Sequence, residues 1–267
     1  MTGRGSAAPV RIAAMVRRLD DGHTLSLEPD LVLPLASVGK VLLLGEVARR
    51  IAAGTLAPDQ PVDLLDDDRA LGGTGLLGLL SPRRWTVADL TAAVAGISDN
   101  AATNALLRVV TLEAVQHLAR TSGLRATTVH DRIRGTRGPD VPPTFATGTA
   151  RELCTFLTDV ATGTWQSRRA SQLLRRWLDR NTDRTLVADT IRHDPWSTGG
   201  VRVANKTGTD TGVRADVGIV AGPHTVVYAV VATFGPGAER TAVAELRRWG
   251  TAVDRLTGAG DHRSANS

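Results

Sequence analysis

The chain carries β-branched, apolar runs at both of its ends and helical patterns between them. Residues 10–19 form one such run, a turn signal follows at 20–22, and residues 24–27 resume the extended pattern. Three more runs, separated by Gly and Pro, lie at 201–206, 216–221 and 225–234. Short apolar runs bounded by turn residues are typical of strands. We therefore predict one antiparallel sheet built from both ends of the chain, with a helical region inserted between them.

The segments between the two groups of strands, and the one that follows them, have the helical spacing of apolar residues. We predict helices at 37–53, 86–95, 100–110, 112–122, 149–162, 167–181, 183–191 and 239–256. Residues 132–143 are rich in Gly, Pro and Arg and are predicted to form a loop. The predicted fold class is α+β, with a single domain over residues 1–267. Within it, an α/β lobe takes about 1–33 and 195–267, and an all-α lobe takes about 34–194.

The composition excludes several classes of function. The net charge of +5 and the pI of about 10.4 suit an anionic partner, but aromatic residues make up only 3 % and the arginines are scattered. Platforms for stacking bases are therefore nearly absent, and we expect no nucleic-acid partner. The N-terminal segment lacks the apolar core of a secretion signal, and no apolar run is long enough to span a bilayer. We expect no membrane partner and a cytoplasmic location, or secretion only if the sequence is a mature form.

Metal and cofactor sites lack a sequence signature as well. Cys154 is the only cysteine, so no internal disulfide is possible, and it is interpreted as a small buried side chain in a helix. The six histidines show no ligand spacing, so neither a metal nor another cofactor is expected. Residues 73–78 fit G-x-G-x-x-G but follow an acidic loop instead of a strand, and we interpret them as a glycine-rich loop.

The first motif that carries chemistry is Ser37-Val38-Gly39-Lys40. Residues three apart share one face of a helix, so Ser37 and Lys40 should lie side by side at a helix start. Serine is a weak nucleophile and needs an adjacent base. A lysine kept neutral by burial and by neighbouring cations can be that base. The pair predicts nucleophilic catalysis by Ser37.

Two further motifs follow in order, Ser98-Asp99-Asn100 and Lys206-Thr207-Gly208. Ser98, at the predicted start of a helix, can pass a proton to a leaving amide nitrogen. Asn100 offers a donor and an acceptor for a substrate amide. Lys206 ends a predicted strand that continues through residues 207–209, where a glycine lets a substrate backbone lie alongside. Its positive charge favours a substrate carboxylate.

Each motif is common alone, but all three in this order resemble class A β-lactamases and penicillin-binding proteins. The resemblance extends over about residues 10–256, including KVLLLGEVARRI after Ser37 and NKTGTDTGVRADVGIV around Lys206. It implies an all-α lobe and an α/β lobe with the site between them, and a β-lactam or a related amide or ester as the small-molecule substrate. The site residues that it implies fall into two groups. The catalytic residues are Ser37, which is acylated, Lys40, the general base, and Ser98, the proton relay. The substrate-binding residues are Asn100, Lys206, Thr207, Gly208, Thr209 and Arg214.

The resemblance also assigns finer roles to this set. The backbone N–H groups of Ser37 and Thr209 would form an oxyanion hole. Arg214 stands about where some members of the family keep an arginine for the substrate carboxylate.

The chain departs from the family in the loop between the second and third motifs. Class A enzymes carry a glutamate there that activates the water for deacylation. The position corresponds to Arg134, and residues 130–140 contain no Glu. Asp131 and Asp140 are the carboxylates that remain as substitute bases. Without a base, deacylation should be slow, because a positioned base contributes about 10²–10⁴-fold in rate.

Two classes of function therefore stay open. The first is a serine hydrolase that is acylated at Ser37, with slow or altered deacylation, or a cytoplasmic esterase or amidase of a biosynthetic pathway. The second is a non-catalytic or single-turnover β-lactam-binding homologue. Labelling of Ser37 by a penicillin or a fluorophosphonate separates a reactive serine from a binding module.

Overall fold

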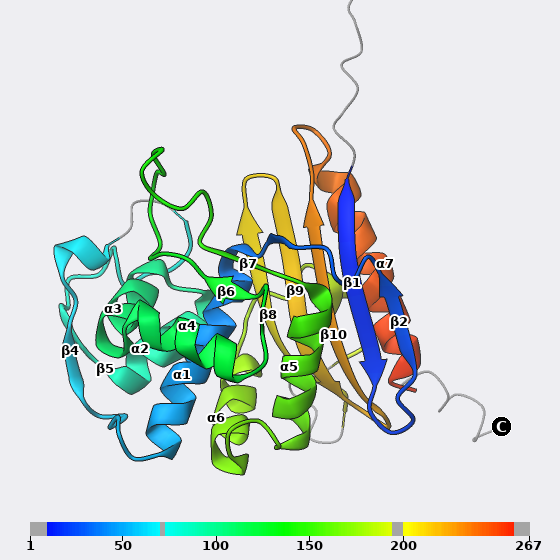
Figure 1. The fold of residues 1–267 in the computed structure, drawn as a ribbon, viewed down its shortest axis with the longest axis horizontal. Coiled ribbons are helices and arrows are strands. Elements are labelled where there is room, and N and C mark those ends of the chain that lie inside the picture. The colour runs from blue at the N-terminus through cyan, green and yellow to red at the C-terminus, as the bar shows by residue number, and fades with distance from the viewer. Residues whose placement is uncertain (1–9, 70–72, 194–199, 259–267) are drawn as a thin grey trace, which may run out of the picture.

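A five-stranded antiparallel sheet with the order β2-β1-β10-β9-β8 takes up one side of the molecule, on the right in Figure 1. The computed structural model describes residues 10–69, 73–193 and 200–258. The strands of this sheet are β1 (Arg11–Arg18), β2 (Thr24–Leu27), β8 (Arg202–Asp210), β9 (Val213–Ala221) and β10 (Thr225–Thr233). Arg11 of β1 faces Thr233 of β10, so strands from the two ends of the chain pair inside one sheet. The predicted sheet is confirmed, and β8 is one of its edges.

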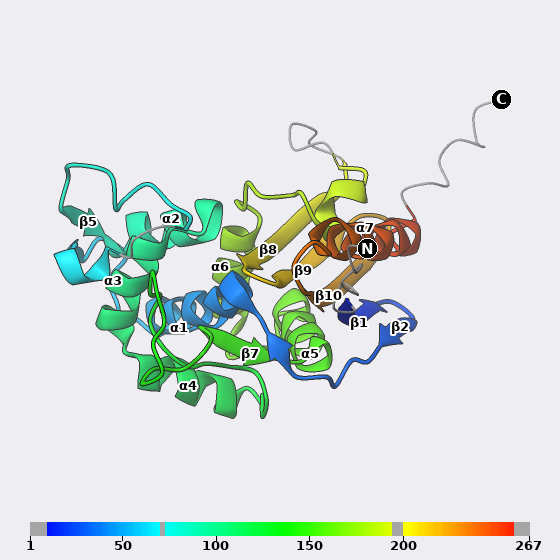
Figure 2. The same cartoon turned by 90° about the horizontal axis from the view of Figure 1, so that it is seen from above.

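Helices cover both faces of the sheet. The helices are α1 (Lys40–Ala52), α2 (Val87–Ile97), α3 (Asn100–Val110), α4 (Leu112–Thr121), α5 (Ala150–Thr162), α6 (Arg168–Leu178) and α7 (Glu239–Leu256). Three short 3-10 helices are η1 (Ala36–Gly39), η2 (Asp66–Asp68) and η3 (Val187–Thr190). Figure 2 shows α7 and α5 on opposite sides of the sheet, and both pack on β1, β9 and β10. No helix in the described ranges is both long and apolar enough to cross a membrane.

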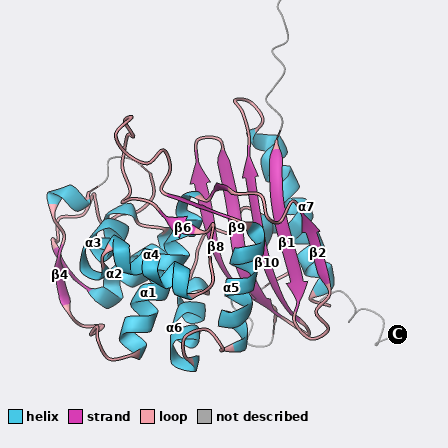
Figure 3. Cartoon of the chain, viewed as in Figure 1, coloured by secondary structure: helices cyan, strands magenta, loops and turns pink. Residues whose placement is uncertain are grey.

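The remaining strands are short and lie among the helices beside β8 (Figure 3). They form the sheets β3-β7-β6 and β4-β5. Their bounds are β3 (Leu33–Pro34), β4 (Pro61–Asp63), β5 (Arg84–Thr86), β6 (Thr128–Val129) and β7 (Ala146–Gly148).

Two apolar cores hold these layers together. One lies between the sheet and α7 and contains Val16, Tyr228 and Leu246. The other runs from the opposite face of the sheet, at Val227, through the helices around Leu42 of α1. Because α1 is buried on nearly all sides, its first turn is held between the sheet and the helical region. The proposed division into two lobes stays a prediction, and its boundary at 194–195 lies outside the described residues.

Besides shifts at the ends of elements, three predicted features differ from the structure. Residues 183–191 do not form an α-helix, because Asp183 bonds to β8 through its side chain, and only η3 is helical there. The helix predicted from Ser37 begins with the tighter η1 and becomes α-helical at Lys40. Ser98 does not begin α3, because Asp99 is the residue that caps that helix, through a hydrogen bond from Ala102.

Candidate active site

Lys40 lies fully buried between α1 and the link that joins α2 to α3. Its Nζ donates to the Ser98 carbonyl oxygen at 2.6 Å, to the Ser98 hydroxyl at 3.1 Å and to Oδ1 of Asn100 at 2.7 Å. Burial lowers the pKa of Lys40 well below its ordinary value, the charge of Lys206 lowers it further, and Asp99 opposes both. A lysine in this setting gains access to its neutral form, which can accept a proton.

The link between α2 and α3 is held in an uncommon conformation. Ser98 has φ 57° and ψ 34°, in the left-handed region. A residue other than glycine takes this conformation only where its surroundings impose it. The buried Asp99 carboxylate supplies much of that restraint, because it accepts three backbone N–H groups: Leu76 at 2.6 Å, Leu77 at 2.8 Å and Ala102 at 2.9 Å. The link is therefore tied to both α3 and the glycine-rich loop.

The glycine-rich loop of residues 73–78 supports this link from a second direction. The Thr74 hydroxyl donates to the Ser98 carbonyl oxygen at 2.7 Å, and the Asn100 N–H donates to the Thr74 carbonyl oxygen at 3.0 Å. Gly75 has φ 115°, and a Cβ there would collide with Asp99. The glycines thus allow a close approach to the link, and the loop and Asn100 line a cavity of about 570 Å³.

Ser37 lies in η1, directly against β8. A Cβ added at Gly208 would lie 3.2 Å from the Ser37 nitrogen, 3.0 Å from the Val38 nitrogen and in collision with the Leu35 carbonyl oxygen. Only glycine lets β8 approach the backbone of η1 this closely. Ala36, the residue before Ser37, has φ 46°. The half-buried Ser37 is therefore presented from a constrained turn beside the third motif.

Lys206 is fully buried in β8, and its Nζ donates to the Thr207 carbonyl oxygen at 2.9 Å. Burial lowers its pKa to about 8, against the raising effect of the negative charges on Asp183 and Asp216. The Thr207 hydroxyl donates to Oδ2 of Asp183 at 2.7 Å. The Lys206-Thr207-Gly208 motif therefore already binds a carboxylate of the protein itself, that of Asp183.

The buried carboxyl group of Asp216, on the neighbouring strand β9, bonds to β8. Asp216 of β9 accepts from Asn205 Nδ2 and the Tyr228 hydroxyl, each at 3.0 Å, and from the Val187 N–H at 3.0 Å and the Ala188 N–H at 3.3 Å. Burial raises the pKa of Asp216 to about 7, although these hydrogen bonds lower it. The network links Asn205, the residue before Lys206, to the apolar core between the sheet and α7.

Arg214 lies apart from the contacts made by Lys40. It pairs with Thr209 in the sheet register, and its side chain is on the face that carries Asp216 and α7. Its guanidinium forms an ion pair with Glu239, the first residue of α7, and donates to the Asp210 carbonyl oxygen at 2.8 Å. It also lies over the Phe234 ring, 5.4 Å from the centroid.

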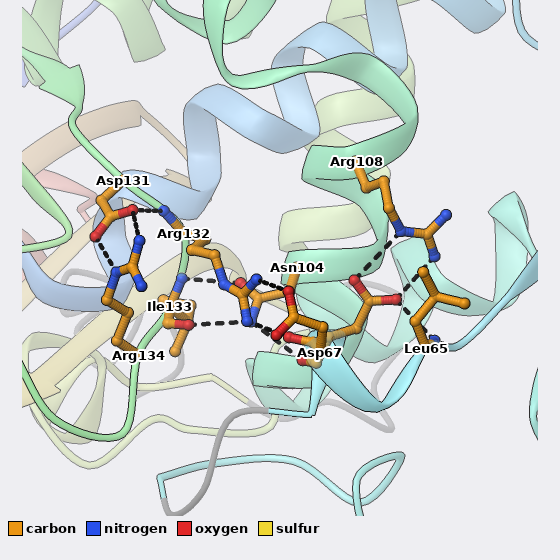
Figure 4. A network of polar contacts seen from close by, with 9 residues as sticks. Leu65, Asp67, Asn104, Arg108, Asp131, Arg132, Ile133 and Arg134 are labelled. Carbon is orange, nitrogen blue, oxygen red and sulfur yellow. Dashed lines mark hydrogen bonds and ion pairs between the residues drawn. The ribbon is translucent and has the colours of Figure 1, made fainter.

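The loop that lacks the glutamate is organised by arginines (Figure 4). Arg134 donates from Nε to Asp131 at 2.6 Å, and Arg137 donates to the same carboxylate oxygen at 2.9 Å. Burial raises the pKa of Asp131, but these bonds and one from the Arg132 N–H outweigh it and lower the pKa. Asp140 is exposed. Arg134, which the sequence analysis places at the position of the family glutamate, thus lies in an ion pair with Asp131.

Asn104 ties this loop to α3. Its Oδ1 accepts from the Ile133 N–H at 2.8 Å, and its Nδ2 donates to the Ile133 carbonyl oxygen at 3.0 Å. Both bonds are made to the residue before Arg134 and fix the backbone there. Arg132 extends the network to Asp67 of η2, with Nη1 and Oδ2 2.5 Å apart.

Sequence reasoning found the residues at the centre and missed the ones that hold them. Lys40, Ser98 and Asn100 come into direct contact, and Gly208 lies against the Ser37 backbone. Four supporting residues had no assigned role: Asp99, Asn104, Asp183 and Asp216. Asn104 has a usable signal, because it lies one helical turn after Asn100 on the same helix face. Asp183 has none, because its partner Thr207 is distant in the sequence.

Comparisons with known proteins bear on the fold and the family of the chain. The chain is 27 % identical to the beta-lactamase regulatory protein BlaB of Streptomyces cacaoi, covering 88 % of this chain and 90 % of that protein. It is 26 % identical to the β-lactamase of Sphaerobacter thermophilus, with a TM-score of 0.82 and coverage of 92 % and 91 %. A PBP-A mutant solved as an acyl-enzyme complex with penicillin G shares the fold, at 22 % identity, a TM-score of 0.79 and coverage of 92 % and 89 %.

These similarities confirm the predicted β-lactamase-like α+β fold and the resemblance to β-lactamases and penicillin-binding proteins. Residues 4–253 match the family described as the beta-lactamase enzyme family. That match covers nearly the whole chain, and the chain therefore belongs to the beta-lactamase enzyme family.

Proposed function

We propose that this protein is a serine acyl-enzyme hydrolase that reacts with a β-lactam or a related amide or ester and releases the acyl group slowly. The observation that carries the proposal is the environment of Lys40. Its Nζ lies 3.1 Å from the Ser98 hydroxyl, and burial together with Lys206 lowers its pKa. A neutral amine at that position is the base that a serine nucleophile requires.

The proposed reaction begins with attack of the Ser37 hydroxyl oxygen on the substrate carbonyl carbon. Lys40 accepts the hydroxyl proton of Ser37 and passes a proton on to the Ser98 hydroxyl. Ser98 gives its own proton to the amide nitrogen or ester oxygen as the bond between that atom and the carbonyl carbon breaks. The N–H groups of Ser37 and Thr209 stabilise the oxyanion. The close approach of Gly208 to the Ser37 nitrogen supports this role, because it brings β8 and η1 together where that charge would form.

Release of the acyl group requires a water molecule and a base. The position that corresponds to the family glutamate carries Arg134, whose guanidinium is bound to Asp131. The Asp131 carboxylate accepts hydrogen bonds from two arginine side chains and one backbone N–H, and its pKa is lowered. A carboxylate with a lowered pKa is a weak base. Asp140 is exposed and has no described contact with the central residues. Neither substitute base is favoured, which supports slow deacylation.

A second candidate function is a β-lactam-responsive regulatory role. The similarity to BlaB, whose name describes a β-lactamase regulatory protein, favours it. A regulator that records β-lactam exposure needs an adduct that persists, and the Arg134–Asp131 pair supplies the slow release. Both candidates share acylation of Ser37 and differ in turnover. An esterase or amidase would instead turn over a substrate without a β-lactam ring.

The test is time-resolved intact-mass spectrometry with millimolar benzylpenicillin, alongside Ser37→Ala and a fluorophosphonate probe. We expect a mass increase of one penicillin that lasts for hours and is absent from Ser37→Ala. Rapid loss of the adduct with accumulating product would favour a turning-over β-lactamase. An adduct that survives in Ser37→Ala, or no labelling by any probe, would overturn the proposal.

A further inference from the structure

Asp183 occupies the part of the site that the sequence assigns to a substrate carboxylate. Its Oδ2 accepts the Thr207 hydroxyl at 2.7 Å. Its Oδ1 accepts the Thr185 N–H at 3.1 Å and the Thr185 hydroxyl at 2.7 Å. Both carboxylate oxygens are therefore used, and the side chain is held in one orientation toward β8.

The segment that carries Asp183 lies between the second and third motifs. Thr182 donates its N–H and its hydroxyl to the Gly96 carbonyl oxygen, just before Ser98. Asn181 donates to Oδ1 of Asn205, just before Lys206, at 3.1 Å. Three consecutive residues thus bridge α2 and β8, which fixes Asp183 beside Thr207.

The charge of Asp183 acts on the cation of the third motif. Its negative charge raises the pKa of Lys206 against the lowering effect of burial. Burial alone would raise the pKa of Asp183, but its hydrogen bonds and the charge of Lys206 outweigh this and lower it. Asp183 is therefore ionised at neutral pH, and Lys206 has an internal counter-ion.

Arg214, the second cation that the sequence analysis assigns to a substrate carboxylate, also has a carboxylate of the protein as its partner. Arg214 forms an ion pair with Glu239 and retains 14 % of its side-chain exposure. A ligand carboxylate that approaches either Lys206 or Arg214 thus meets a protein carboxylate already in place. Like charges within a few ångströms repel strongly in a partly buried site.

We propose that Asp183 is a specificity-determining residue that makes this subsite favour acyl donors with an uncharged ester or amide, over those with a free carboxylate, in the position facing Thr207. The inference rests on the proposed function, because it takes Ser37 and β8 as the two sides of the substrate site. Asp183 acts by charge and by holding the Thr207 hydroxyl.

The experiment is a thermodynamic cycle of ligand binding. It removes the Asp183 charge from the protein and the carboxylate charge from the ligand, separately and together. Dissociation constants are measured by ligand-observed NMR for benzylpenicillin and its methyl ester, with Ser37→Ala and Ser37→Ala/Asp183→Asn. The alanine prevents reaction, and asparagine keeps the size and an acceptor oxygen. We expect Asp183→Asn to improve binding of the free acid about tenfold and that of the ester less than about twofold, because only the acid pair loses a repulsion.

Two controls separate charge from structure. Asp189→Asn removes the same charge from an ion pair with Arg247 away from the site, and should change both ligands equally. Asp183→Ser is a second uncharged variant in case Asp183→Asn unfolds, and should give the same preference. Equal changes for acid and ester in the Asp183 variants, or no binding of either ligand, would overturn the inference.

The outcome is separable from that of the proposed function. A chain that forms the Ser37 adduct but shows no acid-against-ester difference keeps the proposed function and loses this inference. A chain that shows the difference but no adduct loses the proposed function and keeps the subsite.

Discussion

The two sides of the candidate site differ in how they use charge. On one side, Lys40 is buried among three oxygen acceptors and its pKa is lowered, so its neutral form, the base of the proposed reaction, becomes accessible. On the other side, Arg134 keeps its charge and pairs with Asp131. Arginine cannot act as a base at any physiological pH. In the proposed reaction, the side that forms the acyl bond has its base, and the side that would break that bond has a cation where the resemblance places a carboxylate.

The comparison also shows that the second side is ordered. Asn104 bonds both backbone groups of Ile133, as Asp99 bonds the backbone on the first side. A loop that had simply lost its role would not need Arg137 and Arg134 on one carboxylate. The difference between the two sides is therefore one of side-chain chemistry on two well-held frames.

Among the substitutions that test this difference between the two sides, the largest change in the rate of adduct formation is expected at Lys40. Lys40→Met should slow formation of the penicillin adduct by about 10³-fold, since a general base contributes about 10²–10⁴-fold. Lys40→Arg is the matched control, because it keeps the positive charge and cannot lose its proton. It should be as slow as Lys40→Met in quenched-flow mass spectrometry. A fast Lys40→Arg variant would mean that Lys40 serves by charge alone.

A smaller loss is expected at Gly208. Gly208→Ala forces β8 away from the Leu35 carbonyl oxygen and the Ser37 nitrogen. The adduct should form about 10²-fold more slowly, the size of losing one oxyanion donor. Gly138→Ala is the control in the opposite loop, where an added Cβ meets nothing within 4 Å. Equal rates for Gly208→Ala and the unaltered protein would remove the oxyanion role from this contact.

The second side is tested by restoring a carboxylate. Arg134→Glu should speed loss of the adduct by roughly tenfold. This lies below the range of roughly 10²–10⁴-fold for an optimally placed base, because Asp131 would repel the new side chain. Arg134→Gln removes the cation without adding a base and should leave release within about twofold of the unaltered protein. Release that quickens equally in both variants would show that the ion pair, and not the missing base, limits it.

The smallest expected effect is the pH dependence of adduct formation, which concerns the side of the site that contains Lys40 and Lys206. Adduct formation should rise with pH as Lys40 loses its proton. It should then fall by up to about fivefold between pH 8 and pH 9, as Lys206, with a pKa of about 8, loses its charge. Lys206→Arg keeps the charge over this range and should remove the fall. A fall that persists in Lys206→Arg would assign it to another group.

The sequence was sufficient for the sheet and for the residues that meet at Lys40. An apolar run predicted β1, and a β-branched run predicted β10, which is buried along nearly its whole length. The sequence was insufficient where side chains bond across long separations. Asp183 bonds to Thr207 and prevents the helix predicted at 183–191. β9 begins at Val213, earlier than predicted, because Val213 pairs with Asp210 across a tight turn.

The pairing of Arg11 with Thr233 sets the order in which a growing chain can complete this site. A ribosome-bound chain that has emerged only as far as α6 already contains Ser37, Lys40 and Ser98, yet β8 has not been made. Strand β1 must wait for the central strand β10, which is nearly the last element synthesised. Contacts between distant parts of a chain also close slowly. In the proposed reaction, Ser37 therefore acquires its oxyanion-binding partner only at the end of synthesis, and a partial chain holds the proposed nucleophile without a site.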